Sequence, residues 1–215
     1  MPSGIDLAQH HQRITAEQRR EKREALGIAE GMIVLISLGR LGTEKSLDEL
    51  INRFAAAVKL RDDIVLLIVG DGPARAELEK QAKELGIANR VIFTGMVPPE
   101  KVHEYYQLGD IFVSASTSET QGLTYVEAAA NRLPLLCKQD LCLRNVLLPG
   151  ENGYEFTNEE EFLDGVNKLA DDPVLRASAG HRSEEIAASF DKKAFGEAIA
   201  EIYQSARINC ENMQH

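Results

Sequence analysis

The stretch "IFVSASTSETQGLTYVEAAANRLPLLC", residues 111–137, contains two short apolar runs separated by a polar loop and an amphipathic segment. The runs at residues 111–115 and 133–137 have the length and composition of buried strands, and residues 123–131 have those of a helix. Continuously apolar strands that alternate with helices are typical of a parallel sheet covered on both faces. This stretch therefore predicts an α/β fold.

The same alternation extends through most of the chain and predicts one doubly wound, Rossmann-like parallel sheet in a single domain of residues 1–215. Further strands are expected at residues 33–37, 64–70 and 91–95, with a short edge strand in "ENGYEF" at residues 151–156. Further helices are expected at residues 14–27, 46–60, 74–85, 100–108, 159–170, 173–189 and 192–207. The last three would close the fold, and the first, which is rich in both signs of charge, is expected to have a solvated face.

Composition excludes several classes of protein. The 24 Lys and Arg residues against 34 Asp and Glu residues give a net charge of −10, which argues against a general nucleic-acid binder because such proteins need a basic face. No apolar run approaches the roughly 18 residues of a spanning helix, and no signal-peptide pattern follows Met1. Cys137, Cys142 and Cys210 lack metal-binding spacing, so we expect a cytoplasmic, reducing location with Cys137 in the core.

The sequence also lacks the patterns of the common cofactor sites. No G-x-G-x-x-G follows an expected strand, which disfavours nicotinamide and flavin cofactors, and no G-x-x-x-x-G-K-[ST] indicates a P-loop. The five histidines show no metal spacing, and His103 is expected on a helix surface. No metal ion or other cofactor is therefore expected.

The loops after the expected strands are the places to look for a ligand, because open α/β sheets bind ligands beyond the carboxyl ends of their strands. The first loop, "LGRLGTEKSLDEL", carries Arg40 and Lys45 ahead of a helix, a combination that suits a diphosphate. Both cations could instead simply solvate the loop. The second loop, "GDGPA", which contains Asp71, is either a ligand loop or an ordinary tight turn before a helix.

Two glutamates flank the "QGLT" of the opening stretch in an E-x7-E pattern. Glu119 is expected in the loop, and Glu127 lies about 7 Å along the helix that follows. Between them lie the amides of Gly122, Leu123 and Thr124 at the helix N-terminus. This order suits a ligand with hydroxyls, then phosphates, then hydroxyls, as in a nucleotide sugar. From spacing alone the two glutamates could also be surface carboxylates.

Several motifs together resemble a known family. "PSGID", "GRLGTEKSLDELI", "VGDGP", "FTGMVPPEKVHEYYQLGDIFVSAS" and "SETQGLTYVEAAANRLP" resemble the carboxy-terminal, donor-binding half of retaining glycosyltransferases of family 4, which have the GT-B fold. The resemblance extends from residue 2 to about residue 156 in the family's order. The segment "CLRNVLLPG" before "ENGYEF" resembles the enzymes that make glucosyl- or galactosyl-diacylglycerol.

The resemblance implies catalytic roles for three residues. Arg40 and Lys45 would hold the donor diphosphate and neutralise the charge that builds on the leaving nucleoside diphosphate. Glu119 would contact the transferred sugar, and no metal ion is implied because the cations and the helix end neutralise the phosphates. The family's usual "EGFG" is "ETQG" here, a departure at Thr120 and Gln121 that leaves the donor sugar open.

The resemblance also implies a donor-binding set. Glu127 would bind the ribose hydroxyls, and main-chain groups near Met96 and Val97 would bracket the base, with uracil expected. The full set of expected donor-binding residues is Gly39, Asp71, Met96, Val97, Gly122, Leu123, Thr124 and Glu127.

Enzymes of this family have a second Rossmann-like domain, which supplies acceptor contacts. We expect this chain to be a fragment without that amino-terminal domain, which binds a UDP-sugar donor weakly and transfers no hexose by itself. The full enzyme would transfer a hexose such as glucose to an acceptor such as a glycolipid, at the inner face of the membrane. The open alternatives are a non-catalytic nucleotide-binding or regulatory module and a GT-B-like sugar epimerase.

Overall fold

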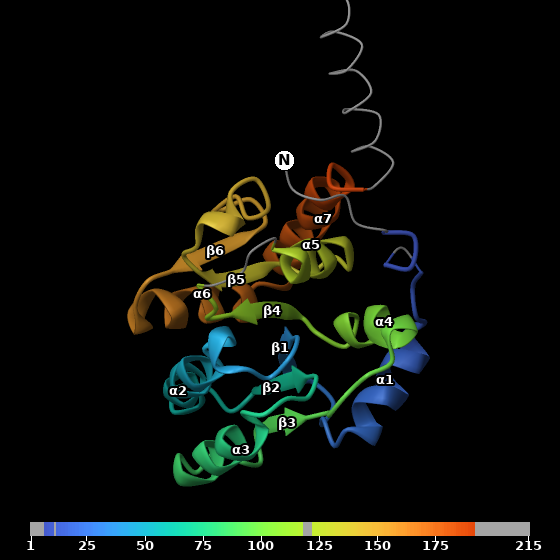
Figure 1. The fold of residues 1–215 in the computed structure, drawn as a ribbon. Coiled ribbons are helices and arrows are strands. Elements are labelled where there is room, and N and C mark those ends of the chain that lie inside the picture. The colour runs from blue at the N-terminus through green and yellow to red at the C-terminus, as the bar shows by residue number, and fades with distance from the viewer. Residues whose placement is uncertain (1–6, 11, 118–121, 192–215) are drawn as a thin grey trace, which may run out of the picture.

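The computed structural model describes residues 7–10, 12–117 and 122–191 and contains one six-stranded sheet with the strand order β3-β2-β1-β4-β5-β6. All five strand pairs are parallel (Figure 1). The strands are β1 (Ile33–Leu38), β2 (Ile64–Val69), β3 (Val91–Phe93), β4 (Ile111–Ser114), β5 (Leu135–Lys138) and β6 (Gly153–Phe156). The strand order reverses between β1 and β4, which is where such sheets bind ligands. The predicted α/β, doubly wound fold is confirmed.

Helices cover both faces of this sheet. They are α1 (Ala16–Ala25), α2 (Leu47–Val58), α3 (Arg75–Glu84), α4 (Val102–Tyr106), α5 (Leu123–Ala130), α6 (Glu159–Asp171) and α7 (Pro173–Ala188). Figure 1 shows α2, α3 and α6 on one side of the sheet and the other four helices on the opposite side. The strands are apolar on both sides because both sides are buried.

The two faces carry separate hydrophobic clusters. On one face, Leu35 of β1 belongs to the cluster formed with Phe54 of α2 and Phe162 of α6. On the other, Ile36 of β1 belongs to the cluster formed with Tyr125 of α5 and residues of α7. Consecutive strand residues therefore point to opposite layers, as strand geometry requires.

The observed elements lie within a few residues of the expected ones, with two informative differences. Strand β3 ends at Phe93, because Gly95 leaves the ladder and forms an isolated antiparallel bridge with Gly70. The helix expected at residues 100–108 is a 3₁₀ turn, η2 (Pro99–Lys101), followed by the single short helix α4. The helix expected at residues 192–207 lies outside the described residues.

Helix α1 has the expected solvated face, with most of its residues exposed, but two of its arginines are partly buried. Arg19 and Arg23 form ion pairs of 2.7 and 2.8 Å with the two carboxylate oxygens of Asp110. Asp110 also accepts a hydrogen bond from the Val34 amide at 2.7 Å. Burial favours the neutral acid, but the two arginines outweigh it and hold the pKa of Asp110 below its usual value. The basic residues thus attach α1 to the start of β1 and β4.

The expectation that His103 lies on a helix surface is wrong. His103 is only 8% exposed, and Tyr106, which follows it by one helical turn, is completely buried. Residues three apart share one face of a helix, and this face of α4 packs inward. Cys137 of β5 is buried, as expected. Within the described part of the chain, no helix combines the length and apolar character needed to cross a membrane.

Candidate functional site

The loops after β1, β2 and β3 are joined by backbone hydrogen bonds at the carboxyl edge of the sheet. The Gly39 amide donates to Val69 O at 3.0 Å, and the Leu41 amide donates to Asp71 O at 3.0 Å. The Gly70 amide donates to Gly95 O at 3.1 Å. These bonds hold the three loops together as one surface.

Close backbone contact explains the glycines of the "GDGP" loop. A Cβ atom on Gly70 would overlap Gly39 O, and one on Gly72 would overlap Leu41 O. Asp71 between them accepts hydrogen bonds from the Gly72 amide at 2.7 Å and from Arg75 at 3.2 Å. Close packing of the backbone therefore explains why this loop contains glycines, without reference to a ligand. Donor binding by Asp71 stays a prediction.

A hollow of about 520 Å³, here called the apolar hollow, opens where these three loops meet. It is lined by Leu38, Gly39, Arg40, Val69, Gly70, Asp71, Gly72, Met96, Val97 and Val102. The structure thus brings together Gly39, Asp71, Met96 and Val97, four of the expected donor-binding residues. An apolar wall edged by backbone polar groups is typical of a site for a flat organic group.

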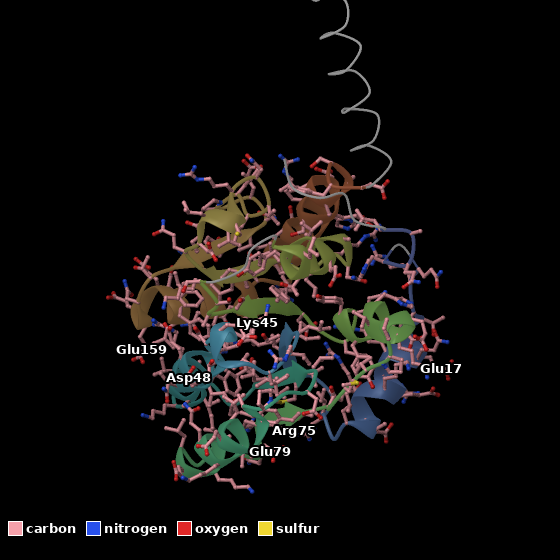
Figure 2. All side chains as sticks on the ribbon, in the orientation of Figure 1. Glu17, Lys45, Asp48, Arg75, Glu79 and Glu159 are labelled. Carbon is pink, nitrogen blue, oxygen red and sulfur yellow. The ribbon has the colours of Figure 1, made fainter. Side chains whose placement is uncertain are left out.

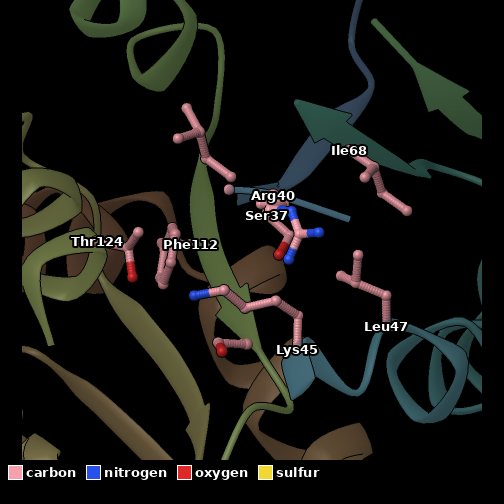
Figure 3. A pocket seen from close by; sticks show the side chains of 10 residues that line it. Ser37, Arg40, Lys45, Leu47, Ile68, Phe112 and Thr124 are labelled. Carbon is pink, nitrogen blue, oxygen red and sulfur yellow. The ribbon is translucent and has the colours of Figure 1, made fainter. Parts of the chain in front are cut away.

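A second and much smaller hollow of about 10 Å³, here called the cationic hollow, lies beside the first and shares Leu38, Gly39 and Arg40 with it. Its other lining residues are Ser37, Lys45, Leu47, Ile68, Phe112, Ser114 and Thr124. In Figure 3 the Lys45 side chain crosses this hollow toward the side where Phe112 and Thr124 lie. Residues from β1 and from α5 therefore face each other where the strand order reverses.

The two predicted cations differ in their surroundings. Lys45 ends the 3₁₀ turn η1 (Thr43–Lys45) and is half-buried, and its Cε would lie 3.6 Å from a Cβ placed on Gly39. The Arg40 side chain is 69% exposed and lies 3.6 Å from the carboxylate of Glu44. Figure 2 shows Lys45 near the middle of the molecule, whereas Glu17 and Glu159 lie at its rim. Lys45 is therefore the better placed cation for an enclosed anion.

The N-terminus of α5 forms the far side of the cationic hollow. Gly122 caps the helix with a left-handed φ of 63°, a conformation that glycine adopts without strain. Helical hydrogen bonding begins with the Tyr125 and Val126 amides, which donate to Gly122 O. The amides of Leu123 and Thr124 therefore precede the first helical bonds, in the position where helices attract anions. Glu119 lies outside the described residues.

Glu127 lines neither hollow, but it lies on the same face of α5 as Thr124, which lines the cationic one. Its Oε2 accepts a hydrogen bond of 2.9 Å from the Tyr106 hydroxyl. Burial raises the pKa of the Glu127 carboxyl, and the Tyr106 hydrogen bond lowers it by less. Tyr106 is absent from the predicted site, because no spacing in the sequence links it to a glutamate 21 residues away.

The described residues contain no group of three or more His, Cys, Asp and Glu side chains that could hold a metal ion. The positive groups that face the cationic hollow are those of Lys45, Arg40 and the α5 N-terminus. The arrangement can neutralise a diphosphate by side-chain and main-chain donors.

The family model for glycosyl transferases group 1 matches residues 18–186, which include all six strands, the helices α2 to α6 and most of α1 and α7. This chain belongs to the group 1 glycosyl transferase family. The match includes both hollows and the E-x7-E segment. The predicted family is therefore confirmed.

Two curated relatives are named alpha-monoglucosyldiacylglycerol synthase. The protein from Streptococcus pneumoniae is 34% identical over 212 residues, which are 97% of this chain and 47% of that protein. The protein from Acholeplasma laidlawii is 30% identical over 204 residues, which are 94% of this chain and 51% of that protein. The chain thus spans about half the length of the curated relatives it matches.

Solved structures show the fold of the group 1 domain. Anabaena Alr3699/HepE in complex with UDP superposes with a TM-score of 0.82 at 24% identity, over 94% of this chain and 56% of that one. WaaG, a glycosyltransferase involved in lipopolysaccharide biosynthesis, superposes with a TM-score of 0.78 at 22% identity, over 94% and 55%. The described fold is therefore that of one Rossmann-like half of a GT-B glycosyltransferase.

Proposed function

We propose that this chain is the donor-binding domain of a retaining hexosyltransferase that uses a UDP-sugar. The observation that carries the proposal is the pair of adjoining hollows at the reversal of strand order. One is apolar and edged by backbone groups, and the other has Lys45 on one side and the N-terminus of α5 on the other. A base and a diphosphate, joined by a ribose, require such a pair.

The donor would lie across both hollows. Met96 and Val97 would bracket the uracil in the apolar hollow, with Gly39 and Asp71 at its edge. The diphosphate would lie between the two cations, Lys45 and Arg40, and the amides at the start of α5, and Glu127 would accept hydrogen bonds from the ribose. The UDP complex of the Anabaena structure supports the choice of nucleotide.

The same groups would assist the chemical step. Breaking the bond between the sugar and the diphosphate leaves negative charge on the departing UDP, and preorganised cations and amide donors stabilise that charge. Lys45 and Arg40 would act in this way, with the α5 amides as additional donors. Glu119 would contact the transferred sugar.

The acceptor would be a lipid-linked molecule. The names of the relatives from Streptococcus pneumoniae and Acholeplasma laidlawii support a glucosyl transfer that yields a glycolipid. We propose that an amino-terminal domain of the same enzyme supplies the acceptor contacts, at the inner face of the membrane. The chain by itself would then bind the donor without transferring the sugar.

Calorimetric titration of the 215-residue chain with UDP, UDP-glucose and GDP tests this function. We expect UDP to bind more tightly than GDP and UDP-glucose more tightly than UDP, with no glucose transferred to a diacylglycerol acceptor. Failure to bind UDP would refute the proposed donor. Equal affinities for UDP and UDP-glucose would favour a nucleotide-binding module without a sugar site, and transfer by the chain alone would contradict its proposed inactivity.

A further inference from the structure

We infer that Tyr106 is a positioning residue that directs the carboxylate of Glu127 toward the ribose diol of the donor. The inference rests on the proposed function, because it needs a ribonucleotide at Glu127. It adds a polar group from α4, a helix that also contributes Val102 to the wall of the apolar hollow. It begins from a single hydrogen bond, between the Tyr106 hydroxyl and Glu127 Oε2 at 2.9 Å.

The hydroxyl of Tyr106 has one proton, and among the described residues two acceptors lie near it. Glu127 Oε2 lies at 2.9 Å, and Thr124 O lies at 3.4 Å. The shorter distance and the charge of the carboxylate both direct the proton to Glu127. One carboxylate oxygen, Oε2, is thereby engaged. A diol that binds this carboxylate meets an acceptor of fixed orientation.

The Tyr106 ring is itself held in place. It is completely buried and contacts the ring of His10 at 6.1 Å between centroids and that of Phe112 at 6.2 Å. These two rings come from the amino-terminal segment and from β4, so Tyr106 is enclosed from two directions. A hydroxyl on a ring held in this way cannot follow the carboxylate if Glu127 rotates, so it selects one orientation.

Asn131 anchors the backbone of α5 in the same region. Its side-chain amide donates to Glu127 O at 2.8 Å, and the same nitrogen lies 2.8 Å from His10 Nδ1. Gln107, next to Tyr106, donates to Asn131 Oδ1 at 3.2 Å. The backbone of Glu127 is thus tied to the residues that enclose Tyr106, and the distance from Tyr106 to the carboxylate is set by packing.

The hydrogen bond also favours the form of Glu127 that a diol needs. An ionised carboxylate offers two acceptor oxygens to the ribose hydroxyls, whereas the neutral acid carries a donor proton on one of them. Burial opposes ionisation of Glu127, and the Tyr106 hydroxyl favours it. The titratable groups that face this carboxyl are Tyr106 and, behind it, His10, and among the described residues no charged side chain contributes to the shift.

The test compares UDP with 2′,3′-dideoxy-UDP, which lacks the two ribose hydroxyls, in calorimetric titrations of the full chain. For the unmodified protein we expect UDP to bind at least tenfold more tightly, since a binding site loses this much when its polar groups are left without partners. In Tyr106→Phe we expect the affinity for UDP to fall about tenfold and that for the dideoxy compound to stay unchanged. Tyr105→Phe changes the neighbouring tyrosine and should alter neither affinity.

The pH dependence gives a second readout that a merely structural role would not change. The ratio of the two affinities cancels the titration of the phosphates and reports the ionisation of Glu127. In Tyr106→Phe this ratio should decline at a higher pH than in the unmodified protein, because the pKa of Glu127 rises when its hydrogen-bond donor is removed. In a Glu127→Ala background, Tyr106→Phe should have no further effect on the ratio.

The outcomes separate the inference from the proposed function. Equal losses for both nucleotides in Tyr106→Phe, with the melting temperature lowered, would show that Tyr106 only supports packing and would overturn the inference while UDP binding stands. Equal affinities of the unmodified protein for UDP and the dideoxy compound would mean that the ribose hydroxyls do not bind Glu127. This result would also overturn the inference. Failure of the unmodified protein to bind UDP would refute the proposed function and with it the inference.

Discussion

Lys45 illustrates how local backbone geometry places a functional side chain. The 3₁₀ turn η1 and the left-handed Ser46 that follows, with φ of 49°, turn the chain between β1 and α2. The Lys45 side chain then extends back past Gly39 into the cationic hollow. Arg40, five residues earlier, is largely exposed. The sequence predicts the same role for Lys45 and Arg40, but in the structure only Lys45 is half-buried.

We predict that Lys45→Ala weakens UDP binding more than Arg40→Ala does. A charge-assisted hydrogen bond from a half-buried lysine contributes about 1.5–3 kcal/mol, whereas an exposed cation contributes about 1 kcal/mol or less. Calorimetry should show an affinity loss of at least about tenfold for Lys45→Ala. Lys59→Ala, at an exposed position after α2, should change nothing. A larger effect from Arg40 would contradict the assignment.

At Glu127 we predict a conflict between stability and binding. The pKa of Glu127 is raised in the folded state, so the folded protein binds more protons than the unfolded chain. The free energy of unfolding therefore falls as the pH rises from the ordinary pKa of a glutamate through the pKa in the folded protein. Glu127→Gln removes this cost, keeps an acceptor for Tyr106 and should raise the melting temperature by about 2 °C at pH 7. The same variant should bind UDP more weakly.

Differential scanning fluorimetry at neutral and acidic pH checks the stability part of this prediction. Below about pH 4 the carboxyl is protonated in both states, and the advantage of Glu127→Gln should disappear. Glu24→Gln, at an exposed position in α1, serves as the control and should show no difference at either pH. A lower melting temperature for Glu127→Gln at neutral pH would show that its charge stabilises the protein instead.

At the scale of elements, α1 depends on one partly buried acid, Asp110. The helix buries none of its own residues, so its attachment comes from Arg19 and Arg23, which bind Asp110 and the carbonyl groups around it. Arg23 also donates to Leu108 O and has its pKa lowered, chiefly by burial. A highly charged helix is thus held by polar contacts rather than by an apolar stripe.

We predict that Asp110→Asn destabilises the protein by about 3 kcal/mol at pH 7, because it leaves two partly buried arginines without their counter-charge. The pKa of Asp110 is lowered in the folded state, so its stabilisation is complete above the ordinary value of about 4 and is lost as the pH falls through the folded value. Urea unfolding of the variant should therefore show a smaller decline in stability on acidification.

Asp62→Asn, at an exposed position before β2, is the matched control and should change the unfolding free energy by less than about 0.5 kcal/mol. An unchanged stability for Asp110→Asn would mean that the carbonyl contacts of Arg19 and Arg23 suffice to hold α1. Proteolysis within α1 gives an independent readout, and it should be faster in the variant because the helix detaches more often.

At the scale of the whole molecule, the proposed donor joins the two halves of the sheet. The apolar hollow belongs to the loops after β1, β2 and β3, and the cationic hollow adds β4 and α5. A ligand that spans both stabilises the folded chain by mass action, because the unfolded chain has neither hollow. At 100 times its dissociation constant, UDP should contribute about 2.7 kcal/mol.

This stabilisation should raise the melting temperature by roughly 5–10 °C. Fluorimetry with increasing UDP checks the value, and uridine provides the control, since it occupies the apolar hollow without the diphosphate and should have a much smaller effect. Equal shifts with uridine and UDP would indicate that the cationic hollow takes no part in binding.

Much of this molecule follows from local sequence. Apolar runs predict five of the six strands, because strands buried on both faces tolerate few polar residues, and the turn in "ENGYEF" predicts the sixth as an edge strand. The "GDGP" and "QGLT" segments point to the ligand-binding edge, because glycine is needed where chains approach closely or a helix starts in a left-handed conformation. Family and fold class could therefore be predicted before the structure.

Contacts between distant residues could not be predicted from the sequence. His103 is polar, yet it lies with Tyr106 on the side of α4 that packs against the core. Arg23 and Asp110 are 87 residues apart, and Tyr106 and Glu127 are 21 apart. The local sequence around Arg23 or around Tyr106 does not indicate which distant residue it contacts.

The sequence by itself thus determined the elements, their parallel arrangement and the edge where a ligand binds, since these depend on periodicity and on glycine conformations that act within a few residues. Only the tertiary structure decided which polar groups meet: Arg19 and Arg23 at Asp110, Lys45 opposite Thr124, and Tyr106 at Glu127. The physical reason is that the partner of a hydrogen bond or ion pair is chosen by the packing of whole elements, which local propensity does not encode.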